Sequence, residues 1–165
     1  MSFDEKLFHS ATLPEQLSLA DVVVEISKYI KEKPRHRYEI IIGSDSAGFE
    51  EHPVSIVTAL TVRRVGNGGR YFYLKSAPKL YHHLHDRIYA EAMSSITLAQ
   101  ELRGRLRDIL GEDIFWQDLI HIDVGPNGLT RSLVDEMVGM VRGFNFTAIV
   151  KPGSFGASVV ADRHT

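Results

Sequence analysis

The feature that most constrains the fold is a run of buried-type residues that begins at Tyr38 and leads into Gly43-Ser44-Asp45-Ser46. Three consecutive isoleucines within it break any alternation of apolar and polar positions, which is typical of a central strand covered on both faces. A carboxylate at the mouth of such a strand is costly unless it is solvated, hydrogen-bonded or bound to a cation. Asp45 is therefore the first candidate site residue. The alternative is that Asp45 caps the following turn by bonding to backbone amides.

Regular elements are predicted on both sides of this strand. Apolar residues recur at helical spacing before Pro34, and the pair Asn67-Gly68 suits a tight hairpin between two strands. Glycine ends a later helical pattern. In chain order, we expect a helix at 17–31, strands at 38–46, 54–64 and 70–75, a helix at 84–110, a strand at 118–124, a helix at 129–143, a strand at 146–150 and a short helix from Ser154.

The order of these elements predicts an α/β fold. Three hairpin-linked strands followed by alternating helices and strands give one mixed sheet flanked by helices. Counted from the strand at Tyr38, we expect five strands in the order 3-2-1-4-5, with only the second strand antiparallel to its neighbours. The length of 165 residues suits a single domain, 1–165, on which residues 1–37 pack as an N-terminal helical extension.

Composition excludes several classes of site. The chain has no cysteine, which rules out disulfides, thiolate metal sites and cysteine nucleophiles. The first six residues lack the long apolar stretch of a signal peptide, and no run is long enough to span a bilayer. We therefore expect a cytoplasmic protein without a membrane partner. The net charge of −2 gives no global attraction to nucleic acid. Local clusters (Arg63, Arg64 and Arg70; Arg103, Arg105 and Arg107) supply either a phosphate-binding face or ordinary solvated surface.

Three further acids are placed where they can join Asp45. Asp123 also ends a strand, and ligands bind beyond the carboxyl ends of parallel strands, so the two carboxylates are adjacent if their strands are neighbours. Glu91 is the acid on the apolar side of its helix; its alternative role is to interact with the helix N-terminal dipole. Asp162 shares a helical face with Phe155 and Ser158. The alternative for Asp162 is a frayed terminal residue paired with Arg163.

Crowded carboxylates repel one another and raise one another's pKa values. Divalent cations with oxygen ligands relieve that repulsion, and Mg²⁺ or Mn²⁺ suits an all-carboxylate site. Two such ions stabilise the attacking and leaving oxygens of phosphodiester cleavage. The sequence therefore favours a two-metal nuclease site formed by Asp45, Glu91, Asp123 and Asp162.

These residues also carry a resemblance to a known family. The order of elements, with one acid on the first strand, one on the next helix, one on the fourth strand and one on the last helix, resembles the ribonuclease H-like fold. Ile42-Gly43-Ser44-Asp45-Ser46, residues 121–128 and Lys151-Pro152-Gly153 resemble the bacterial YkuK-like family, described as predicted ribonuclease H-related nucleases. The resemblance implies metal-dependent cleavage of RNA, DNA or a hybrid. It also implies that His164, near the last acid, assists product departure; the alternative is a surface histidine.

Other motifs lead to weaker hypotheses. The histidines in residues 81–85 suit a transition metal but do not share a helix face. Residues 125–128 form a turn without the lysine of a P-loop. Ser44, Ser46 and His121 lack the nucleophile elbow of a triad. We therefore predict a divalent-metal-dependent nuclease. The alternatives are a noncatalytic nucleic-acid-binding or regulatory module on this fold, and a phosphoryl-transfer enzyme on the same sheet.

Overall fold

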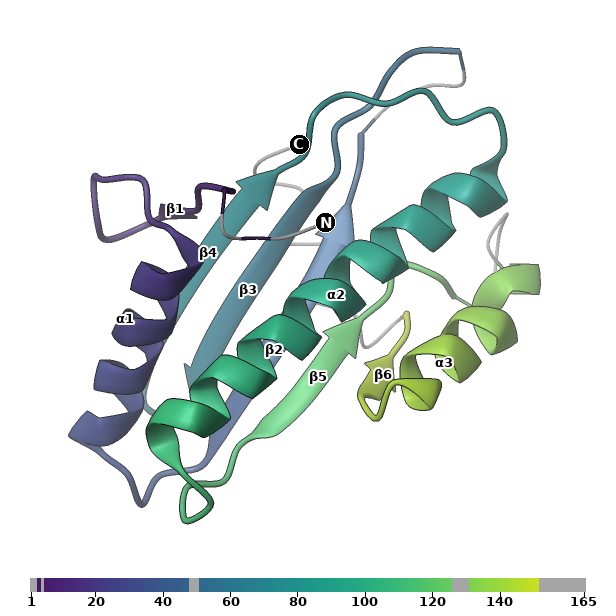
Figure 1. The fold of residues 1–165 in the computed structure, drawn as a ribbon. Coiled ribbons are helices and arrows are strands. Elements are labelled where there is room, and N and C mark those ends of the chain that lie inside the picture. Colours follow the sequence, from purple (N-terminus) through teal and green to yellow (C-terminus); the bar gives the residue numbers. More distant parts are fainter. Residues whose placement is uncertain (1–2, 4, 48–50, 126–130, 152–165) are drawn as a thin grey trace.

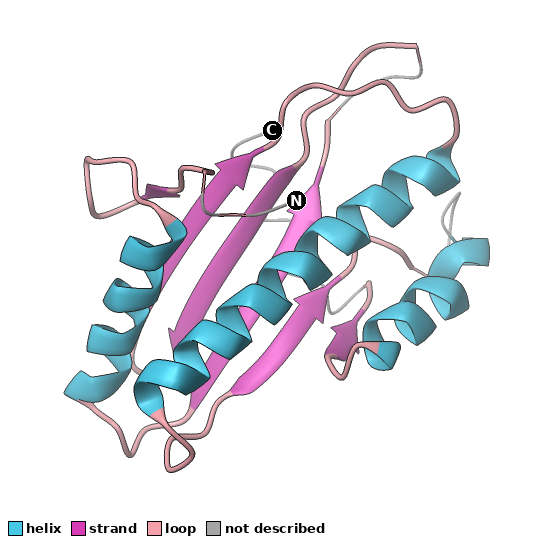
Figure 2. Ribbon diagram, viewed as in Figure 1, coloured by secondary structure: helices cyan, strands magenta, loops and turns pink. Residues whose placement is uncertain are grey.

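The computed structural model describes residue 3 and residues 5–47, 51–125 and 131–151. A mixed sheet and three α-helices form its framework (Figures 1 and 2). The elements in chain order are β1 (His9–Ser10), α1 (Leu19–Glu32), β2 (Tyr38–Asp45), β3 (Val57–Arg64), β4 (Gly69–Lys75), α2 (Leu84–Leu110), β5 (Gln117–His121), the 3-10 helix η1 (Arg131–Leu133), α3 (Val134–Gly143) and β6 (Thr147–Ile149).

The strands of the sheet are ordered β1-β4-β3-β2-β5-β6. β3 is antiparallel to both of its neighbours, whereas β2 and β5 are parallel, as are β5 and β6. The α/β class and this pattern of directions were predicted. The predicted number of five strands is wrong, because the sheet has six strands and β1 adds an edge beside β4; the other five keep the predicted order 3-2-1-4-5 among themselves. A strand of two residues is too short to show any periodicity in the sequence.

The helices position the residues that line the sheet. Figure 1 shows α1 and α2 side by side across one face of the sheet, while α3 lies beside β6 at the edge. α2 contacts both β2 and β5. Ile30 of α1, Ile42 of β2 and Leu102 of α2 belong to one buried apolar cluster, so the same core joins the N-terminal helix to the sheet.

Most element boundaries follow the sequence closely. α2 spans the predicted residues and ends at Leu110, and the capping residue that follows, Gly111, has a positive φ of 75° that suits a glycine. In the described part of the helix predicted at 129–143, a 3-10 turn, η1, is followed by α3, whereas residues 129 and 130 lie outside the described residues. β5 ends at His121, before the predicted limit, but backbone bonding continues: Ile122 N donates to Ile149 O at 2.9 Å and Lys151 N to Val124 O at 2.8 Å. The helix predicted from Ser154 lies outside the described residues.

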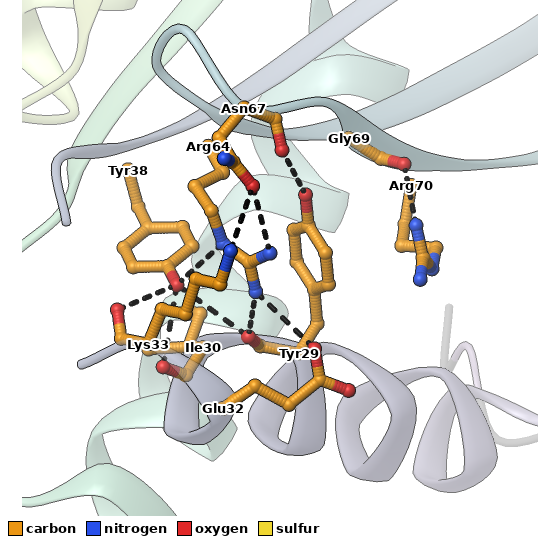
Figure 3. Close-up of polar contacts among 9 residues, drawn as sticks. All are labelled: Tyr29, Ile30, Glu32, Lys33, Tyr38, Arg64, Asn67, Gly69 and Arg70. Atoms are coloured by element: carbon orange, nitrogen blue, oxygen red, sulfur yellow. Dashed lines mark hydrogen bonds and ion pairs between the residues drawn. The ribbon is translucent and has the colours of Figure 1, made fainter.

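At the Tyr38 end of the sheet, a buried arginine forms hydrogen bonds to tyrosines of α1 and β2 (Figure 3). Arg64 Nε donates to the Tyr38 hydroxyl at 2.9 Å, and Nη2 donates to Tyr29 O at 2.6 Å. The guanidinium also lies 3.9 Å from the centre of the Tyr29 ring, a cation–π geometry. Arg64 is therefore a structural residue, and its burial excludes it from both a phosphate-binding face and solvated surface. Within the described part of the chain, no helix is long and apolar enough to cross a membrane.

Candidate functional site

Asp45 and Asp123 lie at the carboxyl ends of adjacent parallel strands. β2 and β5 pair in a register that sets Gly43 opposite His121. Continuing this register by two residues places Asp45 level with Asp123. The predicted adjacency of the two strands is confirmed, and the two carboxylates lie where ligands of such sheets bind.

Glu91 enters this region from α2. Its side chain is buried, with 5% of the residue exposed, and it lies about two turns beyond the helix start at Leu84. The helix dipole acts mainly within the first turn, so it does not explain the position of Glu91. Burial raises the pKa of Glu91 to about 7, and the negative charge of Asp123 adds to the rise. A hydrogen bond from Ser46 and the charge of Arg87 act in the opposite direction.

Ser46 fixes the orientation of Glu91. Its hydroxyl donates to Glu91 Oε1 at 2.5 Å, and both groups are buried. Ser44, two residues earlier, contacts α2 through Ser95. Because side chains alternate along a strand, Asp45 between these two serines is directed away from α2. Glu91 and Asp45 therefore approach the end of the sheet from different sides.

A chain of hydrogen-bonded hydroxyl groups, one helical turn from Glu91, links α2 to β2 and β3. Ser44 Oγ is 2.7 Å from Ser95 Oγ and 2.9 Å from Thr58 Oγ1. Thr58 Oγ1 is in turn 2.7 Å from Ser94 Oγ. This chain of hydroxyl groups was not predicted from the sequence. The sequence feature that indicated it was the Ser94-Ser95 pair, one helical turn after Glu91, together with the two serines on either side of Asp45.

Lys151 is a second feature of the site that was not predicted from the sequence. Its Nζ lies 2.6 Å from Asp123 Oδ1. β6 is the neighbour of β5, so the residues that follow β6 reach the same edge of the sheet as Asp123. The position of Lys151 two residues beyond β6 was the available signal.

The described residues do not form a complete metal site. No group of three or more histidine, aspartate or glutamate side chains among them is arranged to hold a metal ion. Asp162 and His164 lie outside the described residues, so the predicted convergence of four acids stays a prediction. The described site consists of Asp45, Glu91 and Asp123, with Ser46, Arg87 and Lys151 around them.

The rival catalytic sites gain no support. Burial lowers the pKa of His121, which favours its neutral form. Ser44 is held by Ser95 and Thr58, whereas Ser46 is held by Glu91, so neither serine is paired with His121 as a triad requires. His85 Nε2 lies 2.8 Å from Glu136 Oε1, and this hydrogen bond raises the pKa of His85.

The second predicted basic cluster is largely engaged in structural contacts. Arg103 Nε donates to Asp118 Oδ2 at 2.8 Å, and its guanidinium lies 3.9 Å from the centre of the Phe146 ring. Arg107 donates to two backbone carbonyls at 2.9 Å and stacks on Trp116. These contacts hold the loop after α2 and the start of β5, so they do not define a free phosphate-binding face.

Comparison with known proteins places the chain in a family. Residues 21–165 match the family model described as "Ribonuclease H-like". A relative from Bacillus subtilis (strain 168), "Uncharacterized protein YkuK", is 31% identical in an alignment of 174 positions, gaps included, that covers 98% of each chain. No solved structure matches the chain. The chain therefore belongs to the ribonuclease H-like family, and within it to the YkuK-like proteins.

Proposed function

We propose that the protein is a divalent-metal-dependent nuclease that hydrolyses phosphodiester bonds of RNA or DNA. Membership of the ribonuclease H-like family indicates a nuclease-type or nucleic-acid-related function. The observation that carries the finer proposal is the placement of Asp45 and Asp123 on adjacent strand ends, with the buried Glu91 coupled electrostatically to Asp123.

The donor chemistry of the site fits Mg²⁺ or Mn²⁺. The candidate ligands supply carboxylate oxygens, which hard divalent cations prefer. The raised pKa of Glu91 shows that this position disfavours another negative charge, and a bound cation relieves that cost. Asp45, Glu91 and Asp123 would hold the metal, with Asp162 completing the set. A bound ion would activate water and stabilise negative charge on the phosphate.

The protein's own residues would orient the reactants. The Ser46 hydrogen bond restrains Glu91, so that one carboxylate oxygen keeps a fixed direction. The hydroxyl chain through Ser44 and Ser95 holds α2 against β2 at this level. Glu91 would thereby help to orient the attacking water, and His164 would assist product departure as the family resemblance implies.

A noncatalytic nucleic-acid-binding module is the second candidate. Two observations favour it: the described residues contain no group arranged to hold a metal, and Lys151 already neutralises Asp123. Such a module would keep the fold and bind nucleic acid without cleaving it. In both candidates we expect residues 1–165 to act as one domain, because α1 shares its core with the sheet. We also expect either protein to act in the cytoplasm.

Cleavage assays separate the two candidates. RNA, DNA and hybrid substrates are incubated with Mg²⁺ or Mn²⁺ and, in parallel, with EDTA. We expect metal-dependent cleavage that Asp45→Asn lowers by about two orders of magnitude or more, since a positioned metal contributes several kcal/mol. Asp108→Asn, on the exposed side of α2, is the control and should keep full activity. Binding without cleavage across the panel would favour the noncatalytic module.

A further inference from the structure

Lys151 brings a fixed positive charge into the candidate metal site. The 2.6 Å between its Nζ and Asp123 Oδ1 is short even for a charge-assisted hydrogen bond. The side chain of Asp123 is partly buried, with 23% exposed, and that of Lys151 is 49% exposed. Asp123 is the carboxylate that the proposed function requires as a metal ligand.

The backbone and the packing both hold Lys151 in this place. Its amide donates to Val124 O at 2.8 Å, which extends the pairing of β5 and β6 up to the site. Its apolar stem passes over Gly125: a Cβ added at this glycine would lie 2.9 Å from Lys151 Cβ and 3.5 Å from Cδ. A glycine at this position therefore leaves the space that the lysine side chain occupies.

Two carboxylates of the described site already have a positive charge beside them. Asp45, Glu91 and Asp123 are three carboxylates. Lys151 is paired with one of them, and the charge of Arg87 already acts on Glu91. A second ion beside Asp123 would have to displace the ammonium or lie against it, which like-charge repulsion opposes.

We propose that the Lys151 ammonium is a built-in counter-cation of Asp123 that takes the place of one divalent ion. The site then binds a single Mg²⁺ or Mn²⁺, in contrast to the two ions expected from the sequence. This inference rests on the proposed function, because it assigns Lys151 a role in the same metal site. An ordinary surface ion pair, by comparison, contributes little and has no influence on the number of metal ions bound.

Counting bound Mn²⁺ tests the proposal. Mn²⁺ is titrated into the full-length parent protein, the Lys151→Met variant and the Lys31→Met control, and the stoichiometry is measured by calorimetry and by electron paramagnetic resonance. Methionine keeps an apolar stem over Gly125 and removes the charge. Lys31 is an exposed lysine of α1, far from the site in sequence. Circular dichroism checks the fold, and Lys151→Gln is a second neutral variant.

We expect the Lys151 variants to bind one more Mn²⁺ than the parent, with one ion in the parent and two in the variants. Lys31→Met should match the parent. Equal numbers in the parent and the Lys151 variants would overturn the proposal, and the proposed function would survive if that shared number is not zero. If only the Lys151 variants bind Mn²⁺, the single-ion site of the parent and the metal-dependent nuclease are both overturned, because the parent then holds no ion. If no protein binds Mn²⁺, both are overturned.

Discussion

Each end of strand β2 has a buried ionisable group beside it, and the two ends stabilise their groups in different ways. Beside Tyr38, Arg64 is 5% exposed, and beside Asp45, Glu91 is also 5% exposed. Equal exposure means that the cost of burial alone does not distinguish the two. The difference lies in the surrounding groups.

Arg64 is surrounded by oxygen acceptors and two aromatic rings, and the carboxylate of Glu32 is among these acceptors, with Oε2 3.4 Å from Nη2. It donates to the hydroxyl of Tyr38 and to the carbonyl of Tyr29, and both rings lie against the guanidinium (Figure 3). Glu91 receives one hydroxyl hydrogen bond, and the charge of Asp123 opposes its ionisation. A buried charge with as many partners as Arg64 stabilises the fold. A carboxylate with a raised pKa is instead typical of functional sites.

The largest effect on stability is expected at Arg64. Arg64→Met keeps most of the apolar stem but removes the cation–π contact and the hydrogen bonds to Tyr38 and Tyr29. We expect a loss of about 3–4 kcal/mol in the free energy of unfolding. Urea denaturation measures it. The loss should be the same in EDTA and in Mn²⁺, because this end of the sheet has no metal role.

Arg63→Met is the matched control. Arg63 is the neighbouring residue, its side chain is 54% exposed, and its ion pair with Glu39 is long at 3.7 Å. A change within about 0.5 kcal/mol is expected there. Similar losses at Arg63 and Arg64, or a strong metal dependence at Arg64, would contradict the structural role.

Glu91→Gln should change stability in a pH-dependent way. The pKa of Glu91 rises from its ordinary value of 4.5 to about 7 in the folded protein. The folded state therefore holds a proton that the unfolded state releases, and this contribution to stability is lost as pH rises through that window. In EDTA, the glutamine variant should gain roughly 2–3 kcal/mol relative to the parent between the two ends of the window.

Denaturation curves at a series of pH values measure this gain. Glu101→Gln is the control, since Glu101 is an exposed acid of the same helix. Its difference from the parent should change little across the window. A Glu91→Gln variant whose difference from the parent is constant with pH would show that the carboxyl ionises normally.

The hydroxyl chain beside Glu91 predicts a smaller effect. Ser95→Ala removes the 2.7 Å hydrogen bond to Ser44, which crosses from α2 to β2, and should cost about 1 kcal/mol. Ser27→Ala is the control: Ser27 is equally buried in a helix, but its hydroxyl bonds only to Val23 O in the same helix. Because such local bonds stabilise helices little, that variant should stay close to the parent. Equal changes at both serines would exclude a specific role for the interelement bond.

The sequence predicts the elements with long, uniform patterns best. α2 matches its predicted bounds because its apolar positions recur over 27 residues and a glycine ends it. The adjacency of β2 and β5 was predicted from the order of elements and is confirmed. β1 was missed because it exists only through its pairing with β4.

The parts of the site that the sequence did not predict depend on distant contacts. Arg64 was expected at the surface, and its burial depends on tyrosines from α1 and β2 that the local sequence does not reveal. Lys151 meets Asp123 only through the register of β5 and β6. Glu91 was identified because its helix face is a local property, whereas its raised pKa requires the three-dimensional surroundings.

The smallest expected effect is a shift in the pKa of Glu91 when one of its charged neighbours is removed. Asp123 raises its pKa and Arg87 lowers it, so two substitutions should move the pKa in opposite directions. Asp123→Asn removes a negative charge and should lower the pKa of Glu91, and the loss of the partner of Lys151 acts in the same direction. Arg87→Met removes a positive charge one helical turn from Glu91 and should raise the pKa.

Carbon-detected NMR titration of the Glu91 carboxyl group in EDTA measures both shifts in the folded protein. Asp108→Asn on the exposed side of α2 should leave the titration unchanged, because solvent screens its charge. The sign of each shift carries the test, since a general loosening of the site would expose Glu91 to water and lower its pKa in both variants. Opposite signs would show that Glu91 is tuned by the specific charges around it. Shifts of the same sign would show that burial alone sets its pKa, and the contrast with Arg64 would then be one of packing and not of charge.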